Sequence, residues 1–87
     1  MNTAVVVWMV GRLVSDATLT LGAANPLYTH LRNALDDITA GRTNGAIGKL
    51  GAFQNQVATY LNRGDLTEEQ GETLIAGAQD VIDLLSE

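Results

Sequence analysis

The stretch that decides the fold is Gly48–Leu85, GKLGAFQNQVATYLNRGDLTEEQGETLIAGAQDVIDLL, which reads as two amphipathic helices joined by a tight turn. The second helix begins with a capping box, because Thr67 can accept a hydrogen bond from the backbone of Gln70 while the Gln70 side chain reaches back. The first helix ends at Gly64, since glycine adopts the left-handed conformation that closes a helix. The segment therefore predicts a helical hairpin, and it carries no catalytic constellation.

Apolar residues recur at helical spacing in both halves of this hairpin, from Thr43 or Asn44 to Asn62 and over residues 68–86. Gln54 falls within the apolar face of the first helix, so we expect its amide to bond to backbone carbonyls or to the neighbouring helix. Gly71 falls on the apolar face of the second helix, where a neighbouring helix can approach closely. The two faces consist of Ala46, Ile47, Leu50, Phe53, Val57, Tyr60 and Leu61, and of Leu74, Ile75, Ala78, Val81, Ile82 and Leu85.

A third helix precedes them. Asn25 suits the N-cap and Pro26 the first helical position, and Ala40-Gly41 ends the helix. Its buried stripe consists of Leu27, Leu31, Ala34, Leu35 and Ile38. The sequence thus predicts an all-α fold: three antiparallel helices over residues 26–40, 44–62 and 68–86, with an additional N-terminal helical or extended segment packed on them. We interpret residues 1–87 as one helical domain, with an N-terminal apolar segment and connector over 1–22 and a three-helix core over 23–87.

The N-terminal segment allows two interpretations. The valines of Ala4–Val10 and the alternation of Thr18–Leu21 favour an extended pair that turns near Ser15-Asp16. Read instead as a helix from Ala4 to Ser15, with Ala17–Leu21 as an extended connector, the segment buries one apolar face: Val6, Met9, Val10, Leu13 and Val14. We favour the helix. It turns Trp8 away from the core beside Val5 and Arg12, and these three residues are the candidate interface.

Charge and composition exclude several classes of protein. The net charge is −5, with a balance of +1 over residues 1–35 and −6 over residues 36–87, and the five basic residues form no cluster. Such a surface repels phosphate backbones, so we expect no nucleic-acid binding. There is no cysteine for a disulfide or a thiolate site. The apolar run at Ala4–Val10 ends at Gly11-Arg12, far short of a transmembrane segment.

The reactive side chains do not form a catalytic, cofactor-binding or metal-binding set. His30 is the only histidine, and Ser15 and Ser86 have no neighbouring base. The acidic pairs Asp36-Asp37 and Glu68-Glu69 are expected on exposed helix faces or caps. Arg63-Gly64-Asp65 spells a cell-adhesion tripeptide in a turn, but a helix end explains the same residues. Gly48 and Gly51 are expected to let two helices, or two subunits, pack closely. We therefore expect no enzyme.

The A-F-x-N-Q-V run at Ala52–Val57, followed nine residues later by Leu66-Thr67, is the most specific motif of the chain. Through this motif and the residues given below, residues 21–86 resemble the small helical modules known as FIMAH-like domains. Two features depart from the pattern: Gln54 stands where relatives usually have an aliphatic residue, and the chain opens at an initiator-like methionine. The second leaves open an excised domain, a free-standing protein or a subunit of an assembly. The resemblance rests on Ala23, Asn25, Leu27, Leu31, Leu35, Gly41, Thr43, Leu50, Ala52, Phe53, Asn55, Gln56, Val57, Leu66, Thr67, Leu74, Ile75 and Ala78.

The resemblance implies an extracellular accessory domain of a larger bacterial or archaeal secreted or cell-surface protein, with no established catalysis and no catalytic residues to carry over. We accordingly predict a non-catalytic interaction or structural module. Its partner is a protein or a second copy of the chain, reached through the apolar N-terminal segment. The alternative is a small acidic regulator of the antitoxin or inhibitor kind, in the cytoplasm, that binds a basic partner protein.

Overall fold

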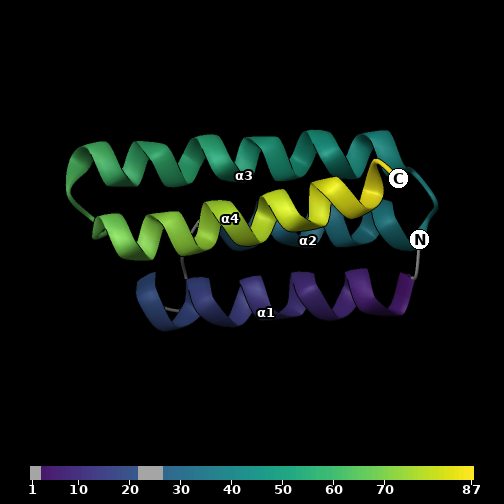
Figure 1. Ribbon diagram of the computed structural model, residues 1–87, viewed down its shortest axis with the longest axis horizontal. Coiled ribbons are helices and arrows are strands. Elements are labelled where there is room, and N and C mark those ends of the chain that lie inside the picture. Colours follow the sequence, from purple (N-terminus) through teal and green to yellow (C-terminus); the bar gives the residue numbers. More distant parts are fainter. Residues whose placement is uncertain (1–2, 22–26) are drawn as a thin grey trace.

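Four helices make up the computed structural model, which describes residues 3–21 and 27–87. They are α1 (Thr3–Leu21), α2 (Leu27–Thr39), α3 (Thr43–Arg63) and α4 (Glu68–Leu85). Consecutive helices run antiparallel, and α1 packs against α2 and α4 but not against α3 (Figure 1). The described residues therefore form an all-α, four-helix up-and-down bundle.

The helix prediction for the N-terminal segment is confirmed, but the extended connector that we placed after it is wrong. α1 runs without a break from Thr3 to Leu21, so neither the extended connector at Ala17–Leu21 nor an extended pair turning near Ser15-Asp16 exists. The reason is burial: Ala17 is 1% exposed and continues the stripe of Val6, Val10 and Leu13, so the helical face carries on past Ser15. The predicted cap at Asn25-Pro26 lies outside the described residues.

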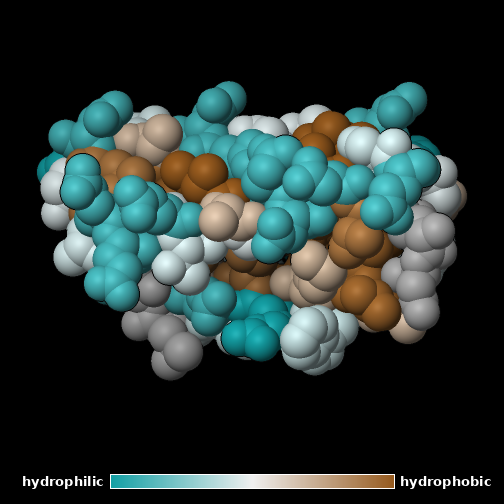
Figure 2. All heavy atoms as spheres, in the orientation of Figure 1, coloured by the Kyte–Doolittle hydropathy of each residue, from teal (hydrophilic) through white to brown (hydrophobic). Residues whose placement is uncertain are grey.

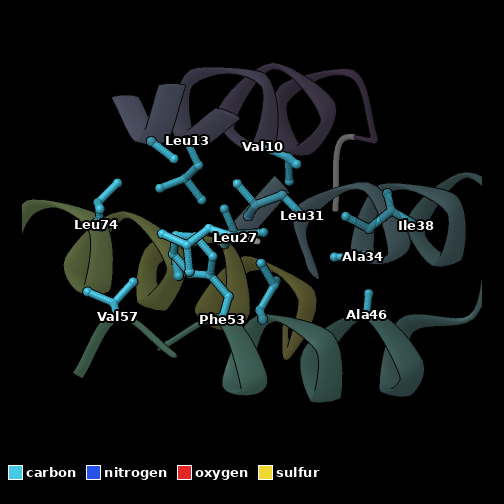
Figure 3. Packing of buried hydrophobic residues seen from close by; sticks show 14 of the residues in the cluster. Val10, Leu13, Leu27, Leu31, Ala34, Ile38, Ala46, Phe53, Val57 and Leu74 are labelled. Carbon is cyan, nitrogen blue, oxygen red and sulfur yellow. The ribbon is translucent and has the colours of Figure 1, made fainter. Parts of the chain in front are cut away.

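One apolar core fills the bundle, and all four helices contribute to it. Val10 and Leu13 of α1 point towards Leu27 and Leu31 of α2, with Phe53 of α3 directed into the same space (Figure 3). Phe53 is fully buried and is the largest such side chain. The faces predicted for α3 and α4 are confirmed, since their members are buried or packed against the core.

Both turns that flank α3 close in the same way. At the end of α3, Gly64 has a φ of 79°, and the backbone N–H groups of Gly64 and Asp65 donate to the carbonyls of Leu61 and Tyr60. At the end of α2, Gly41 also has a φ of 79°. Here the backbone N–H groups of Gly41 and Arg42 donate to the backbone carbonyls of Ile38 and Asp37. This bond pair is the Schellman motif, which ends a helix and reverses the chain at once.

Polar contacts close the start of α4 and join α4 to α3. The capping box is confirmed: the Thr67 hydroxyl accepts from the Gln70 backbone at 3.1 Å, and the Gln70 side chain accepts from the Thr67 backbone at 3.0 Å. Gln54 Nε2 donates to the Ile75 carbonyl at 3.2 Å and to Gln79 Oε1 at 3.1 Å, as expected for an amide in an apolar face.

Candidate functional site

The outward side of α1 carries Val5, Trp8 and Arg12, which we call the α1 surface. These residues share a side because they stand three and four positions apart on a helix. Trp8 is 61% exposed and Val5 is 44% exposed, the two largest values among the large hydrophobic residues described. The Arg12 guanidinium lies 5.3 Å from the centre of the Trp8 ring, within the range of a cation–π contact. Trp8 therefore faces away from the core, as the helical reading predicts.

A groove of about 370 Å³ runs between α1 and α4 beside this surface. Leu13 and Gly77 form part of its floor, and a Cβ added at Gly77 would lie 2.7 Å from Leu13 Cδ2. Polar residues cover much of α3 and α4 on this side, whereas apolar residues are visible between α4 and α1 (Figure 2). The groove between α1 and α4 is lined by Trp8, Met9, Arg12, Leu13, Asp16, Thr73, Ala76, Gly77 and Asp80.

A second groove, of about 310 Å³, lies on the other flank of α1, against α2. Tyr28, which is 41% exposed, stands at its edge with Arg32 and Asp36 one and two turns further along α2. Gly11 opens the α1 side, since no atom lies within 4 Å of the place where its Cβ would be. The remaining lining residues are Val14, Leu31 and Leu35.

Asp37 is the polar residue that sequence reasoning placed wrongly. The acidic pair Asp36-Asp37 is expected on an exposed face, but Asp37 is only 7% exposed. Its carboxylate accepts from Arg42 Nε at 2.9 Å and from Lys49 Nζ at 3.1 Å. These hydrogen bonds, first from Arg42 and then from Lys49, lower the pKa of Asp37 below its ordinary value.

The surroundings explain why Asp37 is buried. The Schellman turn at Gly41 brings Arg42 back over the last turn of α2, and Gly45 leaves room for the carboxylate on α3. A Cβ at Gly45 would lie 2.7 Å from Asp37 Oδ2. The group joins α2 to α3, and both of its cations stay partly exposed. Asp37 is thus a structural link between two helices.

The other sequence candidates do not converge on a reactive site. His30 is half-buried, and no three His, Cys, Asp or Glu side chains among residues 3–21 and 27–87 are grouped as metal ligands. Ser15 is exposed, and the Ser86 hydroxyl donates to the Ile82 carbonyl. The described residues therefore show no arrangement of groups suited to catalysis.

The adhesion tripeptide and the glycine pair also have structural accounts. Arg63 Nε lies 3.4 Å from Asp65 Oδ2, so the two charged ends of the tripeptide pair with each other across the turn. Gly48 and Gly51 have no neighbouring atom within 4 Å of their Cβ positions. They do not mediate close helix packing within the chain, which contradicts that part of the prediction.

Comparison with protein family models identifies the family of this chain. The FIMAH domain model matches residues 3–83. The chain belongs to the FIMAH domain family. The match begins at Thr3, so it takes in α1, which the resemblance over residues 21–86 left out. No curated protein and no solved structure matches the chain significantly.

FIMAH domains are small structural modules, found in surface proteins, that are not known as enzymes. Within the described part of this FIMAH domain, no helix is both long and apolar enough to span a bilayer. Gln54 lies in the apolar face of α3, and its two hydrogen bonds to α4 account for the amide there.

Proposed function

We propose that this FIMAH domain is a non-catalytic interaction module of a secreted or cell-surface protein, and that its copies associate through the α1 surface. The observation that carries the proposal is Trp8, which is 61% exposed in a chain with only 5% aromatic residues. Tryptophan and arginine are enriched where protein interfaces derive most of their binding energy, and here Arg12 stacks on Trp8.

The distribution of charge favours a second copy as the partner. Each copy carries a net charge of −5, so most of its surface repels another copy. The charged side chains of α1 are Arg12 and Asp16 alone, which balance. Two copies can therefore meet along α1 without bringing acidic surfaces together.

The length of α1 bounds the strength of this association. Nineteen residues at about 1.5 Å each make a helix of about 28 Å. One helix face of that length buries less than the roughly 800 Å² per partner of a standard interface. We therefore expect a weak dimer whose population rises with protein concentration.

Light scattering coupled to size-exclusion chromatography tests the proposal over a range of protein concentrations. Trp8→Ser is expected to lower the average mass towards the monomer while far-UV circular dichroism keeps its helical signal. Tyr28→Ser is the matched control, because it removes another exposed aromatic residue outside the α1 surface. A monomer for wild type at every concentration, or the same loss in both variants, would refute self-association.

The acidic face of α4 supports a second candidate, a regulator that binds a basic protein. Glu68, Glu69, Glu72, Asp80 and Asp83 are all exposed along this helix. Such binding would weaken with added salt and would be insensitive to Trp8→Ser. A gene that encodes a signal peptide and β-domains upstream supports the surface module, and a neighbouring toxin gene supports the regulator.

A further inference from the structure

The two grooves beside α1 share one chemical pattern. On α1, Trp8, Arg12 and Asp16 follow at four-residue spacing and line the groove against α4. On α2, Tyr28, Arg32 and Asp36 follow at the same spacing and line the groove against α1. An aromatic ring, a guanidinium and a carboxylate therefore stand in line, one helical turn apart, on each flank of the same helix.

We infer that these grooves bind a neutral oligosaccharide, with Trp8 and Tyr28 as the surfaces on which sugar rings stack. Sugars combine an apolar C–H face with a rim of hydroxyl groups, and an exposed aromatic ring beside paired donors and acceptors matches both. Arg12 and Arg32 supply planar N–H donors, and Asp16 and Asp36 supply acceptors. The two grooves are of similar size and stand at the lower end of the volumes typical of ligand sites, about 300–1,000 Å³.

The charge of the grooves argues for an uncharged ligand. Arg32 shares its groove with one carboxylate, Asp36, and Arg12 shares its groove with Asp16 and Asp80. Neither groove carries an excess of positive charge, and the whole chain has a net charge of −5. An acidic polysaccharide would be repelled, whereas a neutral one encounters no such barrier.

The position of Trp8 favours a stacking site that is already formed. Arg12 lies over one face of the Trp8 ring at 5.3 Å, which restrains the ring while 61% of the residue stays exposed. A restrained ring loses less conformational entropy when it binds. The two grooves lie on opposite flanks of a helix about 10–12 Å across with its side chains, so a chain of several sugars reaches both and a single sugar does not. Such a chain crosses the outward side of α1, so it competes with a second copy for the α1 surface.

Affinity electrophoresis through gels that contain a neutral β-glucan, a galactomannan or a xylan tests the inference, with polygalacturonate as the acidic comparison. We expect at least one neutral polysaccharide to retard the protein and polygalacturonate to leave it unretarded. Tyr28→Ala and Trp8→Ala are each expected to weaken binding about tenfold, the order of one lost aromatic contact. Arg63→Ala is the control, because Arg63 also stacks on a tyrosine, Tyr60, but lines neither groove.

The Tyr28 variant separates this inference from self-association, because Tyr28 lies outside the α1 surface. Weaker retardation of Tyr28→Ala with an unchanged dimer supports sugar binding independently of self-association. Unretarded migration of the wild type in all three neutral gels would overturn the inference of sugar binding. Retardation of the Trp8→Ala/Tyr28→Ala double variant equal to that of the wild type would overturn it as well. The use of both grooves is tested with fragments of the polysaccharide that retards the protein. If a long fragment binds no more tightly than the disaccharide, one chain does not occupy both grooves.

Discussion

Gly71→Ala measures how closely α3 and α4 approach. Gly71 is buried in the first part of α4, and a Cβ added there would lie 2.5 Å from Leu61 Cδ1 and 2.6 Å from both Cδ2 and Cγ. The three contacts involve both methyl groups of Leu61 and its branch carbon Cγ, so moving one methyl group aside does not relieve them and the whole end of the side chain must shift. Overpacking of this sort costs about 1–3 kcal/mol.

Helix propensity acts in the opposite direction, and a second glycine isolates it. Alanine is favoured over glycine in a helix by about 1 kcal/mol. Gly48 is exposed within α3 with no atom near its Cβ position, so Gly48→Ala should raise the free energy of unfolding by up to that amount. The free energy of unfolding of Gly71→Ala should then be about 1–3 kcal/mol lower than that of Gly48→Ala. Each kcal/mol corresponds to a difference in Tm on the order of 4–8 °C.

The double variant with Leu61→Ala identifies the cause. With Leu61 shortened, the added methyl group has room, and Gly71→Ala should become as stabilising as Gly48→Ala. Urea denaturation followed by circular dichroism gives the four free energies of the cycle, and we expect a coupling of about 1–3 kcal/mol. The reasoning is refuted if Gly71→Ala stabilises wild type as much as Gly48→Ala does, or if the coupling is close to zero.

Two further variants test the core and the link between α2 and α3. Phe53→Ala should lower the free energy of unfolding by about 3–5 kcal/mol, a large share of the total for a domain of this size, measured in the same urea titration. Asp37→Asn should destabilise the domain at neutral pH, whereas the exposed Asp36→Asn should not. Because the folded-state pKa of Asp37 lies below the ordinary 3.8, its stabilisation is present above about pH 4 and is lost as the pH falls through the folded value. Thermal melts of wild type and Asp37→Asn should therefore converge in acid, and a constant difference between them would contradict this assignment.

Local patterns predicted most of the bundle because their physical causes are local. The capping box at Thr67 and the left-handed stop at Gly64 depend on neighbours within one turn. The partners of Gln54 followed from one rule, that an amide in an apolar face must be satisfied. The outward direction of Trp8 followed from helical periodicity alone.

The features that the sequence did not reveal depend on how helices meet. The continuation of α1 to Leu21 was obscured by the alternation of Thr18–Leu21, which resembles a strand until the burial of Ala17 is known. The burial of Asp37 requires the turn at Gly41 to return Arg42 and the space at Gly45 to admit a carboxylate. The grooves exist only once α1 is placed between α2 and α4.

The positions of these features imply a division of roles between α1 and the other three helices. Gln54, the capping box and the ion pairs of Asp37 with Arg42 and Lys49 all lie in the part of the chain from α2 to α4, where they specify how the three helices join. α1 contributes aliphatic residues to the core and presents its only aromatic ring to solvent. Changes at Trp8 should therefore alter binding with little loss of stability, whereas changes at Phe53 or Asp37 should alter stability first. The surface that we assign to function is the part of the molecule that its fold requires least.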